Sequence, residues 1–236
     1  MPFARPNRLA IVALGPSSHD YIVDCERAGG RHVLFDQTWV VNTYAGVLDH
    51  DMVLAMDGLR TQEKRAAAGN KKIANLLALF RRHDRPVMTS SAYPEDYPTS
   101  QAFPLEMVAG LLDCDYFRST PAYGVALAMA LGVKELHLYG CDYNWRGCSE
   151  VEPGRANLEF WIGRAQGRGM IVRWPPSSTL FDTNGHDGPR HYGYDDVDVA
   201  CRVDERGKPH FTMTPREPPD AATMESRYDH GKPGER

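Results

Sequence analysis

Short apolar runs alternate along this chain with longer segments whose apolar residues recur every three to four positions. The runs are continuous rather than interleaved with polar residues, which is typical of strands buried on both faces of a parallel sheet. The predicted strands are residues 8–14, 38–42, 51–57, 86–91, 134–142 and 170–174. The predicted helices are residues 18–28, 61–84, 103–112, 121–131 and 154–169.

This alternation of strands and helices predicts an α/β fold. We expect a Rossmann-like, three-layer α/β/α arrangement with a mostly parallel sheet, formed as a single domain by residues 1–203. Residues 204–236 are polar, rich in proline and poor in aliphatic side chains. Such a composition cannot bury a core, so a polar, flexible tail is expected there.

Composition narrows the class of protein. The chain has 236 residues, of which 42% are hydrophobic and 25% charged, as in a globular protein with one sizeable core. The formal net charge of −4 disfavours a protein that coats nucleic acid, although it does not exclude one local basic patch. No apolar run reaches the roughly 20 residues that span a membrane, and five scattered cysteines favour free thiols in a reducing cytoplasm.

Small or polar residues follow nearly every predicted strand. The carboxyl ends of parallel strands meet at one edge of the sheet, where proteins of this fold class bind ligands. We therefore expect a polar rim around a ligand at that edge. Its residues are Gly15, Pro16, Ser17, Ser18, Asn42, Thr43, Asp57, Ser90, Ser91, Ser119, Thr120, Gly140, Cys141, Asp142 and Tyr143.

The turn GPSS at residues 15–18 has two interpretations. A glycine lets a ligand approach the backbone, and the serines can cap the next helix while they offer N–H and O–H groups to a phosphate. The same residues also suit an ordinary capped turn. The segment matches neither the GxGxxG fingerprint nor a P-loop, but the other polar strand ends favour the ligand-binding interpretation.

Several stretches, taken in order, resemble a superfamily of nucleotide-sugar-binding enzymes. They are ALGPSS at 13–18, VVNTYA at 40–45, AMD at 55–57 and STPAYGVALAMALGVKELHLYGCDY at 119–143. The superfamily includes bacterial sialyltransferase-like enzymes, the Maf flagellin glycosyltransferases and the 6-hydroxymethylpterin pyrophosphokinases. The chain departs from it at Ala13, where the family turn has glycine, and at Ser18, where it has leucine.

The resemblance implies contacts with a nucleotide. Residues 15–17 would contact its phosphates or ribose, and Asn42 would touch the nucleotide as well. Ser119 and Thr120 would hold its base or ribose. These are roles of the family's residues, and they are assigned to this chain only at the positions where its motifs match.

The resemblance also implies roles for two carboxylates. Asp57 would lie near the sugar or a metal, and Asp142 with Tyr143 would close the pocket. A carboxylate at a strand end can equally cap a helix or fix a loop. Both interpretations of Asp57 and Asp142 stay open at this point.

Two further clusters lie beyond the resemblance. Arg155, near the start of a predicted helix, could clamp a phosphate or pair with Glu159 one turn later. In the stretch NGHDGPRHYGYDD, His191 is the candidate catalytic base, and Tyr192 and Tyr194 are candidate phosphate-binding residues, by analogy with sialyltransferase-like enzymes. A flexible lid or a surface turn is the alternative, and the spacing of its histidines matches no familiar metal site.

The sequence therefore favours a cytoplasmic glycosyltransferase-like enzyme that binds an activated nucleotide donor and transfers its sugar to an acceptor hydroxyl. The sequence indicates no firm cofactor for it, and a protein, a glycan or modified DNA could serve as acceptor. A pyrophosphokinase-like phosphoryl transferase is the alternative, and it would need Mg²⁺ on carboxylates such as Asp57 and Asp142. A nucleotide-binding module without catalytic activity is the third interpretation.

Overall fold

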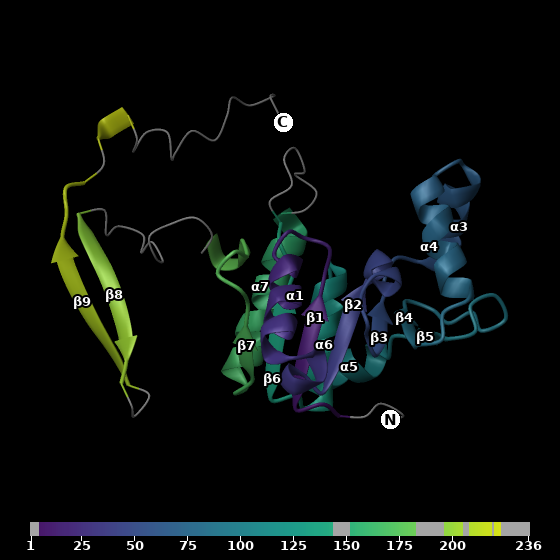
Figure 1. Ribbon diagram of the computed structural model, residues 1–236, viewed down its shortest axis with the longest axis horizontal. Helices are drawn as coiled ribbons and strands as arrows, with labels where there is room; N and C mark the ends of the chain where they lie inside the picture. The colour runs from purple at the N-terminus through teal and green to yellow at the C-terminus, as the bar shows by residue number, and fades with distance from the viewer. Residues whose placement is uncertain (1–4, 144–151, 183–195, 205–207, 219, 223–236) are drawn as a thin grey trace. The chain divides into compact units, whose positions relative to one another are not determined.

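A computed structural model describes the chain except for residues 1–4, 144–151, 183–195, 205–207, 219 and 223–236 (Figure 1). The chain divides into two compact units, Met1–Phe181 and Asp182–Arg236. The first unit contains the α/β fold. The second contains a β-hairpin.

The first unit is built on one seven-stranded sheet in the order β5-β4-β3-β2-β1-β6-β7, and all six pairs of neighbours are parallel. The strands are β1 (Arg8–Val12), β2 (Gln37–Val41), β3 (Met52–Leu54), β4 (Val87–Thr89), β5 (Ser100–Ala102), β6 (Glu135–Tyr139) and β7 (Ile171–Arg173). The chain runs outward from β1 to β5 and then returns to place β6 on the other side of β1. The order therefore reverses between β1 and β6, where the carboxyl ends of parallel strands leave a crevice.

Helices cover both faces of the sheet, as the three-layer prediction requires (Figure 1). They are α1 (Ser18–Ala28), α2 (Arg31–Leu34), α3 (Leu59–Ala67), α4 (Lys71–Arg81), α5 (Leu105–Leu112), α6 (Thr120–Leu131) and α7 (Glu152–Gly167), with 3₁₀ turns at Asn42–Gly46 and Leu180–Asp182. Leu9 and Ile11 of β1 pack in one cluster with α5, α6 and α7. Ala10 and Val12 point to the other face and pack with α1 and α4.

The apolar runs predict most of this sheet correctly, and the α/β fold class is confirmed. One strand was missed: β5 has the sequence SQA, which carries no apolar run. One helix prediction was wrong, because residues 61–84 form two helices rather than one. Gly69 adopts a left-handed φ of 97° between them, and Asn70 caps the second helix by accepting a bond from the N–H of Ile73.

The second unit holds an antiparallel hairpin of β8 (Val197–Val203) and β9 (Pro209–Pro215). The predicted domain boundary after residue 203 falls between these two strands. The predicted tail thus contributes β9, which its polar composition did not suggest. Within the described residues, no helix is long and apolar enough to cross a membrane.

Candidate functional site

Two small cavities lie at the carboxyl edge of the sheet, and Leu14 borders both. The switch-point cavity, of about 200 Å³, lies where the strand order reverses between β1 and β6. It is lined by Ala13, Leu14, Gly15, Val41, Ser119, Thr120, Pro121, Gly140, Cys141, Asp142 and Tyr143. The β2–β3 cavity, of about 170 Å³, is lined by Leu14, Asn42, Thr43, Ala55, Asp57, Leu59, Gln62, Arg65, Ile73, Leu76, Leu77 and Phe80.

Asp142 lines the switch-point cavity and is hydrogen-bonded to Ser17, which does not line the cavity. The backbone N–H of Ser17 donates to Asp142 Oδ2 at 2.7 Å, and its hydroxyl donates to Oδ1 at 2.9 Å. The hydroxyl also accepts the N–H of Gly140 at 2.9 Å, and the N–H of Thr179 reaches Asp142 Oδ1 at 3.3 Å. The buried carboxylate is thus compensated by three hydrogen bonds from two segments of the chain, the turn at Ser17 and the loop at Thr179.

Gly15 and Gly140 allow the ends of β1 and β6 to approach closely. The N–H of Gly15 donates to the carbonyl of Gly140 at 2.8 Å. A Cβ on Gly15 would lie 2.7 Å from Asp142 Oδ2, and a Cβ on Gly140 would lie 2.0 Å from the carbonyl oxygen of Ala13. Gly140 also has a φ of 64°, in the left-handed region. These glycines make room for neighbouring protein atoms.

The remaining polar groups of the GPSS turn are also engaged inside the protein. The N–H groups of Ser18, His19 and Asp20 donate to the carbonyls of residues 15–17 at 3.1–3.2 Å. The Ser18 hydroxyl is paired with the hydroxyl of Tyr44 at 2.6 Å. The turn therefore joins β1 to β6, and its hydrogen bonds favour a structural turn over a phosphate cradle, although the Ser17 side chain makes no capping bond to α1.

The opposite wall of the switch-point cavity has free hydrogen-bonding capacity. Ser119 caps α6 by position, but its side chain makes no capping bond. Ser119 Oγ and the hydroxyl of Tyr143 are buried close to each other, and neither makes a hydrogen bond of normal geometry with any described residue. Buried polar groups are nearly always paired in folded proteins, so two such hydroxyls lining one cavity indicate a site for a polar ligand.

Tyr143 is held in a fixed place and a fixed protonation state. Its N–H donates to the Thr179 hydroxyl at 3.0 Å, and Gly154 of α7 packs so closely that a Cβ there would lie 3.0 Å from the ring. Burial raises the pKa of the Tyr143 phenol well above its usual value. The phenol therefore stays neutral at physiological pH and can donate a hydrogen bond.

The β2–β3 cavity brings together Asn42, Thr43 and Asp57. Asn42 has a left-handed φ of 49° at the end of β2, a conformation that costs free energy and is often found at functional sites. Arg65 supplies a cation at the same cavity and donates to Gln62 at 3.1 Å. The sequence did not single out Gln62 and Arg65, because they lie on α3 within a strongly polar helical segment.

The two candidate magnesium ligands do not form a joint site. Asp142 lines the switch-point cavity and Asp57 lines the β2–β3 cavity. The oxygens of Asp142 already accept three hydrogen bonds from Ser17 and Thr179. This donor set does not fit a magnesium ion shared by both carboxylates.

The structure places Arg155 beside Glu159, as the i, i+4 interpretation predicts. Its Nε lies 2.9 Å from Glu159 Oε1, which also accepts the N–H of Phe181. Arg155 lines neither cavity. His191, Tyr192 and Tyr194 lie outside the described residues, so their proposed roles stay predictions.

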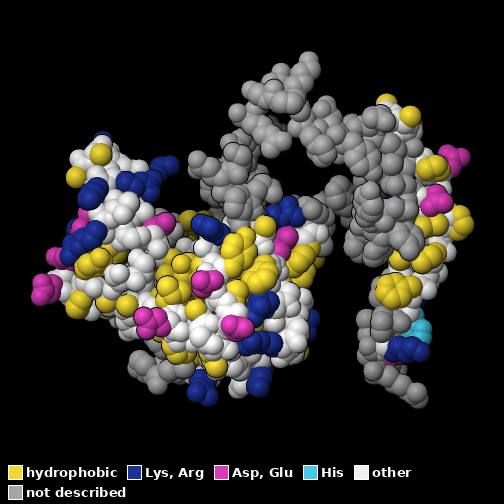
Figure 2. Space-filling view, turned by 180° about the vertical axis from the view of Figure 1, so that it is seen from behind, with side chains coloured by type: hydrophobic (Ala, Val, Ile, Leu, Met, Phe, Trp, Pro, Cys, Tyr) yellow, Lys and Arg dark blue, Asp and Glu magenta, His cyan; other side chains and the backbone are white. Residues whose placement is uncertain are grey.

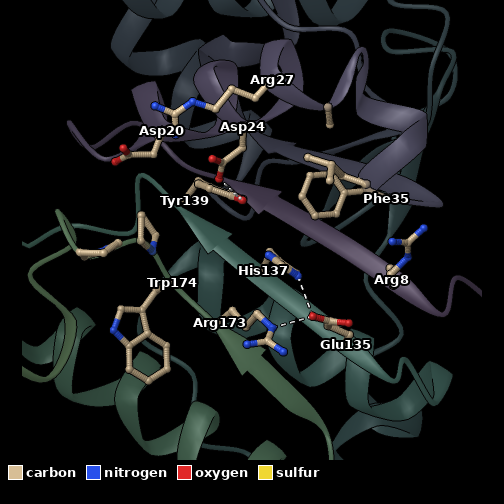
Figure 3. Close-up of a pocket in the computed structure, with 14 residues that line it drawn as sticks. Arg8, Asp20, Asp24, Arg27, Phe35, Glu135, His137, Tyr139, Arg173 and Trp174 are labelled. Atoms are coloured by element: carbon tan, nitrogen blue, oxygen red, sulfur yellow. Dashed lines mark hydrogen bonds and ion pairs between the residues drawn. The ribbon is translucent and has the colours of Figure 1, made fainter.

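A groove larger than these two cavities lies away from every predicted site residue. This groove of about 690 Å³ lies over β6 and β7 beside α1 (Figure 3). Tyr139 donates to Asp24 at 2.9 Å, and Glu135 accepts from His137 at 3.0 Å and Arg173 at 2.6 Å. Asp24, Glu135, His137 and Arg173 are therefore paired within the groove, and nothing in the sequence pattern pointed to it.

No family model and no curated protein matches the sequence. Among solved structures, the sialyltransferase CstII from Campylobacter jejuni with CMP-3FNeuAc is 15% identical, with a TM-score of 0.48 over 77% of this chain and 86% of that one. CstII with a trisaccharide acceptor and CMP is 13% identical, with a TM-score of 0.46 over 94% and 98% of the two chains. An α-2,3-sialyltransferase from the same organism is 15% identical, with a TM-score of 0.45 over 79% and 86%. At such values the likeness assigns no activity to this chain.

Proposed function

We propose that this protein is a glycosyltransferase that uses a nucleotide sugar and binds the donor's nucleotide in the switch-point cavity. One observation carries the proposal. Ser119 Oγ and the Tyr143 hydroxyl are buried and make no hydrogen bond of normal geometry with any described residue, at the point of the sheet where α/β proteins bind ligands. The sequence resemblance to nucleotide-sugar-binding enzymes supports a nucleotide sugar as the ligand.

The cavity wall suits the nucleotide part of such a donor. Ser119 stands at the N-terminus of the 12-residue helix α6, where the helix dipole favours negative charge. Ser119 and Thr120 supply hydroxyls for a ribose or a phosphate oxygen. Tyr143 supplies a neutral phenol that can donate to an oxygen as negative charge develops on the leaving phosphate.

The second cavity suits the sugar part. The β2–β3 cavity adjoins the first at Leu14 and offers an amide, a hydroxyl and a carboxylate from Asn42, Thr43 and Asp57. Carbohydrate hydroxyls both donate and accept hydrogen bonds. Asn42 and Thr43 can donate and accept in return, and Asp57 can accept. Arg65 at the same cavity would pair with a carboxylate or phosphate on the donor.

Transfer would proceed by direct displacement at the anomeric carbon. A base takes the proton of the acceptor hydroxyl, the new glycosidic bond forms, and the bond to the donor's phosphate breaks. His191 stays the proposed base, with Tyr192 and Tyr194 as further donors to the phosphate. Ser17 and Asp142 would act as positioning residues that hold the ends of β1 and β6 together.

Binding and turnover are tested with the full chain and a panel of nucleoside mono- and diphosphates and nucleotide sugars. A ligand present at 100 times its Kd stabilises the folded state by about 2.7 kcal/mol, which a thermal-shift assay detects. The proposal also requires that the stabilising nucleotide sugar be hydrolysed or transferred in the presence of EDTA. Strict dependence on Mg²⁺ would support the phosphoryl transferase instead, and binding without turnover would support the module without catalytic activity.

A further inference from the structure

The α3–α4 hairpin, residues 59–82, carries a concentration of positive charge that the rest of the chain does not share. Although the formal net charge is −4, the 20 residues from Lys64 to His83 contain six lysines and arginines and no aspartate or glutamate. Lys and Arg side chains gather over this hairpin in the space-filling view (Figure 2). The nearest acidic residues along the sequence are Glu63 and Asp84.

Most of these cations are exposed and unpaired. Lys64, Lys71, Lys72 and Arg82 are exposed, and none of the four has an ion-pair partner among the residues that the structure describes. Arg81 is the exception, since its Nη2 lies 3.7 Å from Glu63 Oε1. Four unpaired cations on one hairpin form a surface that attracts anions.

The position of two lysines increases this attraction. Lys71 and Lys72 occupy the first turn of α4, which contains no acidic residue. The N-terminus of a helix is already positive, so cations there lower the stability of the helix. The charges and the helix dipole together produce a positive field at the tip of the hairpin.

The exposed face of α4 is shaped to approach a partner closely. Lys71, Asn75, Ala78 and Arg82 follow one another at intervals of four and three residues, so they lie on one face. Asn75 and Ala78, which have short side chains, lie in the middle of this face. Lys71 and Arg82 lie at its two ends, about 16 Å apart along the helix axis. The opposite face is buried, with Leu76, Leu77 and Phe80 in the core of the first unit.

We infer that the α3–α4 hairpin is a docking surface for duplex nucleic acid. Two helices joined by a three-residue turn that contains Gly69 have the connectivity of a helix-turn-helix element. In that element the N-terminal residues of the second helix enter the major groove. Here Lys71 and Lys72 would contact phosphates, and Asn75 would reach base edges.

The same surface is poorly suited to a lipid bilayer. Helices that lie in a membrane interface insert large apolar side chains beside their cations. Between Lys64 and His83 the structure exposes charged residues, alanine, asparagine and glycine, and no large apolar side chain. Repeated phosphates on a rigid polymer match this arrangement better. The inference does not depend on the proposed function, because duplex binding is measured without donor or turnover.

The test is fluorescence anisotropy of a labelled 20-base-pair DNA duplex with the full chain, titrated at several salt concentrations. With about four phosphate contacts, affinity should fall about 100-fold between 50 and 200 mM salt. Substituting K71Q/K72Q should make the slope of log K against log salt shallower by about two. K134Q/K208Q removes the same two charges elsewhere and should leave that slope unchanged.

A second variant separates binding from folding. K71E/K72E should abolish duplex binding without lowering the melting temperature, because acidic residues in a first helical turn are favourable. The inference is overturned if the wild-type chain leaves the anisotropy of the duplex unchanged at 50 mM salt and 100 times the duplex concentration. It is also overturned if K71E/K72E binds like K134Q/K208Q, or if only vesicles with anionic lipid, and not the duplex, are bound.

Discussion

Replacing Ser17 by alanine should lower the stability of the protein and spare its affinity for nucleotide. The hydroxyl of Ser17 serves two buried groups at once: it donates to Asp142 Oδ1 and accepts the N–H of Gly140. Its loss leaves that N–H without a partner and removes the hydroxyl bond to the carboxylate. Each buried group left unsatisfied costs about 1–3 kcal/mol, so a total of about 2–4 kcal/mol is expected.

Urea unfolding of the Ser17→Ala variant measures this change. The midpoint should fall while the slope m stays constant, because the unfolded surface is unchanged. Ser119→Ala is the matched control, since Ser119 Oγ makes no hydrogen bond of normal geometry with any described residue, and its effect on stability should stay within about 0.5 kcal/mol. If Ser17→Ala instead keeps full stability and loses nucleotide affinity, then the GPSS turn binds phosphate and our interpretation of its hydrogen bonds is wrong.

Two further predictions concern histidines and a glycine. Burial lowers the pKa values of His83 and His137, so the unfolded chain binds protons at higher pH than the folded one. Stability should therefore be complete above pH about 6.5 and decline as the pH falls towards 5.5. Urea unfolding across this range should show a smaller decline for His83→Gln than for the control His32→Gln, and a flat wild-type profile would contradict the assignment. Gly140→Ala should cost more than about 3 kcal/mol, because a methyl group would meet the Ala13 carbonyl. Gly163→Ala, in open space on α7, should be neutral or stabilising, and equal melting temperatures for the two variants would refute the argument.

Hydrophobic patterning was sufficient to predict the sheet, because strands buried on both faces appear in the sequence as apolar runs. The prediction failed for elements whose sequence contains no apolar run. The strand SQA of β5 pairs with β4 through its backbone, although its side chains are small or polar. The break at Gly69 was hidden because Ile73, Leu76 and Phe80 continue a helical pattern, while the turn that ends α3 depends on the backbone of one residue.

Many of the strand-end residues that the sequence singled out line two cavities at the carboxyl edge of the sheet, but the pairing of their polar groups could not be predicted. Ser17 and Asp142 are separated by 125 positions, and their mutual bonds exist only once β1 and β6 lie side by side. The same folding that occupies Ser17 leaves Ser119 Oγ and the Tyr143 hydroxyl without a hydrogen bond of normal geometry to any described residue. Strand-end residues therefore predicted the edge at which we propose a ligand binds, while the hydrogen bonds of the structure show which of their polar groups are already paired.

The central claim is that a nucleotide binds through Ser119 and Tyr143 in the switch-point cavity. Isothermal titration of wild-type, Ser119→Ala and Tyr143→Phe proteins with the nucleotide selected by the thermal-shift panel tests it directly. Each variant removes one hydroxyl that makes no hydrogen bond of normal geometry with any described residue, so its melting temperature without ligand should equal that of the wild type. Its Kd should rise by roughly 10- to 100-fold, the loss of one hydrogen bond to a charged group at about 1.5–3 kcal/mol. Unchanged Kd values in both variants would place the nucleotide elsewhere and contradict the account.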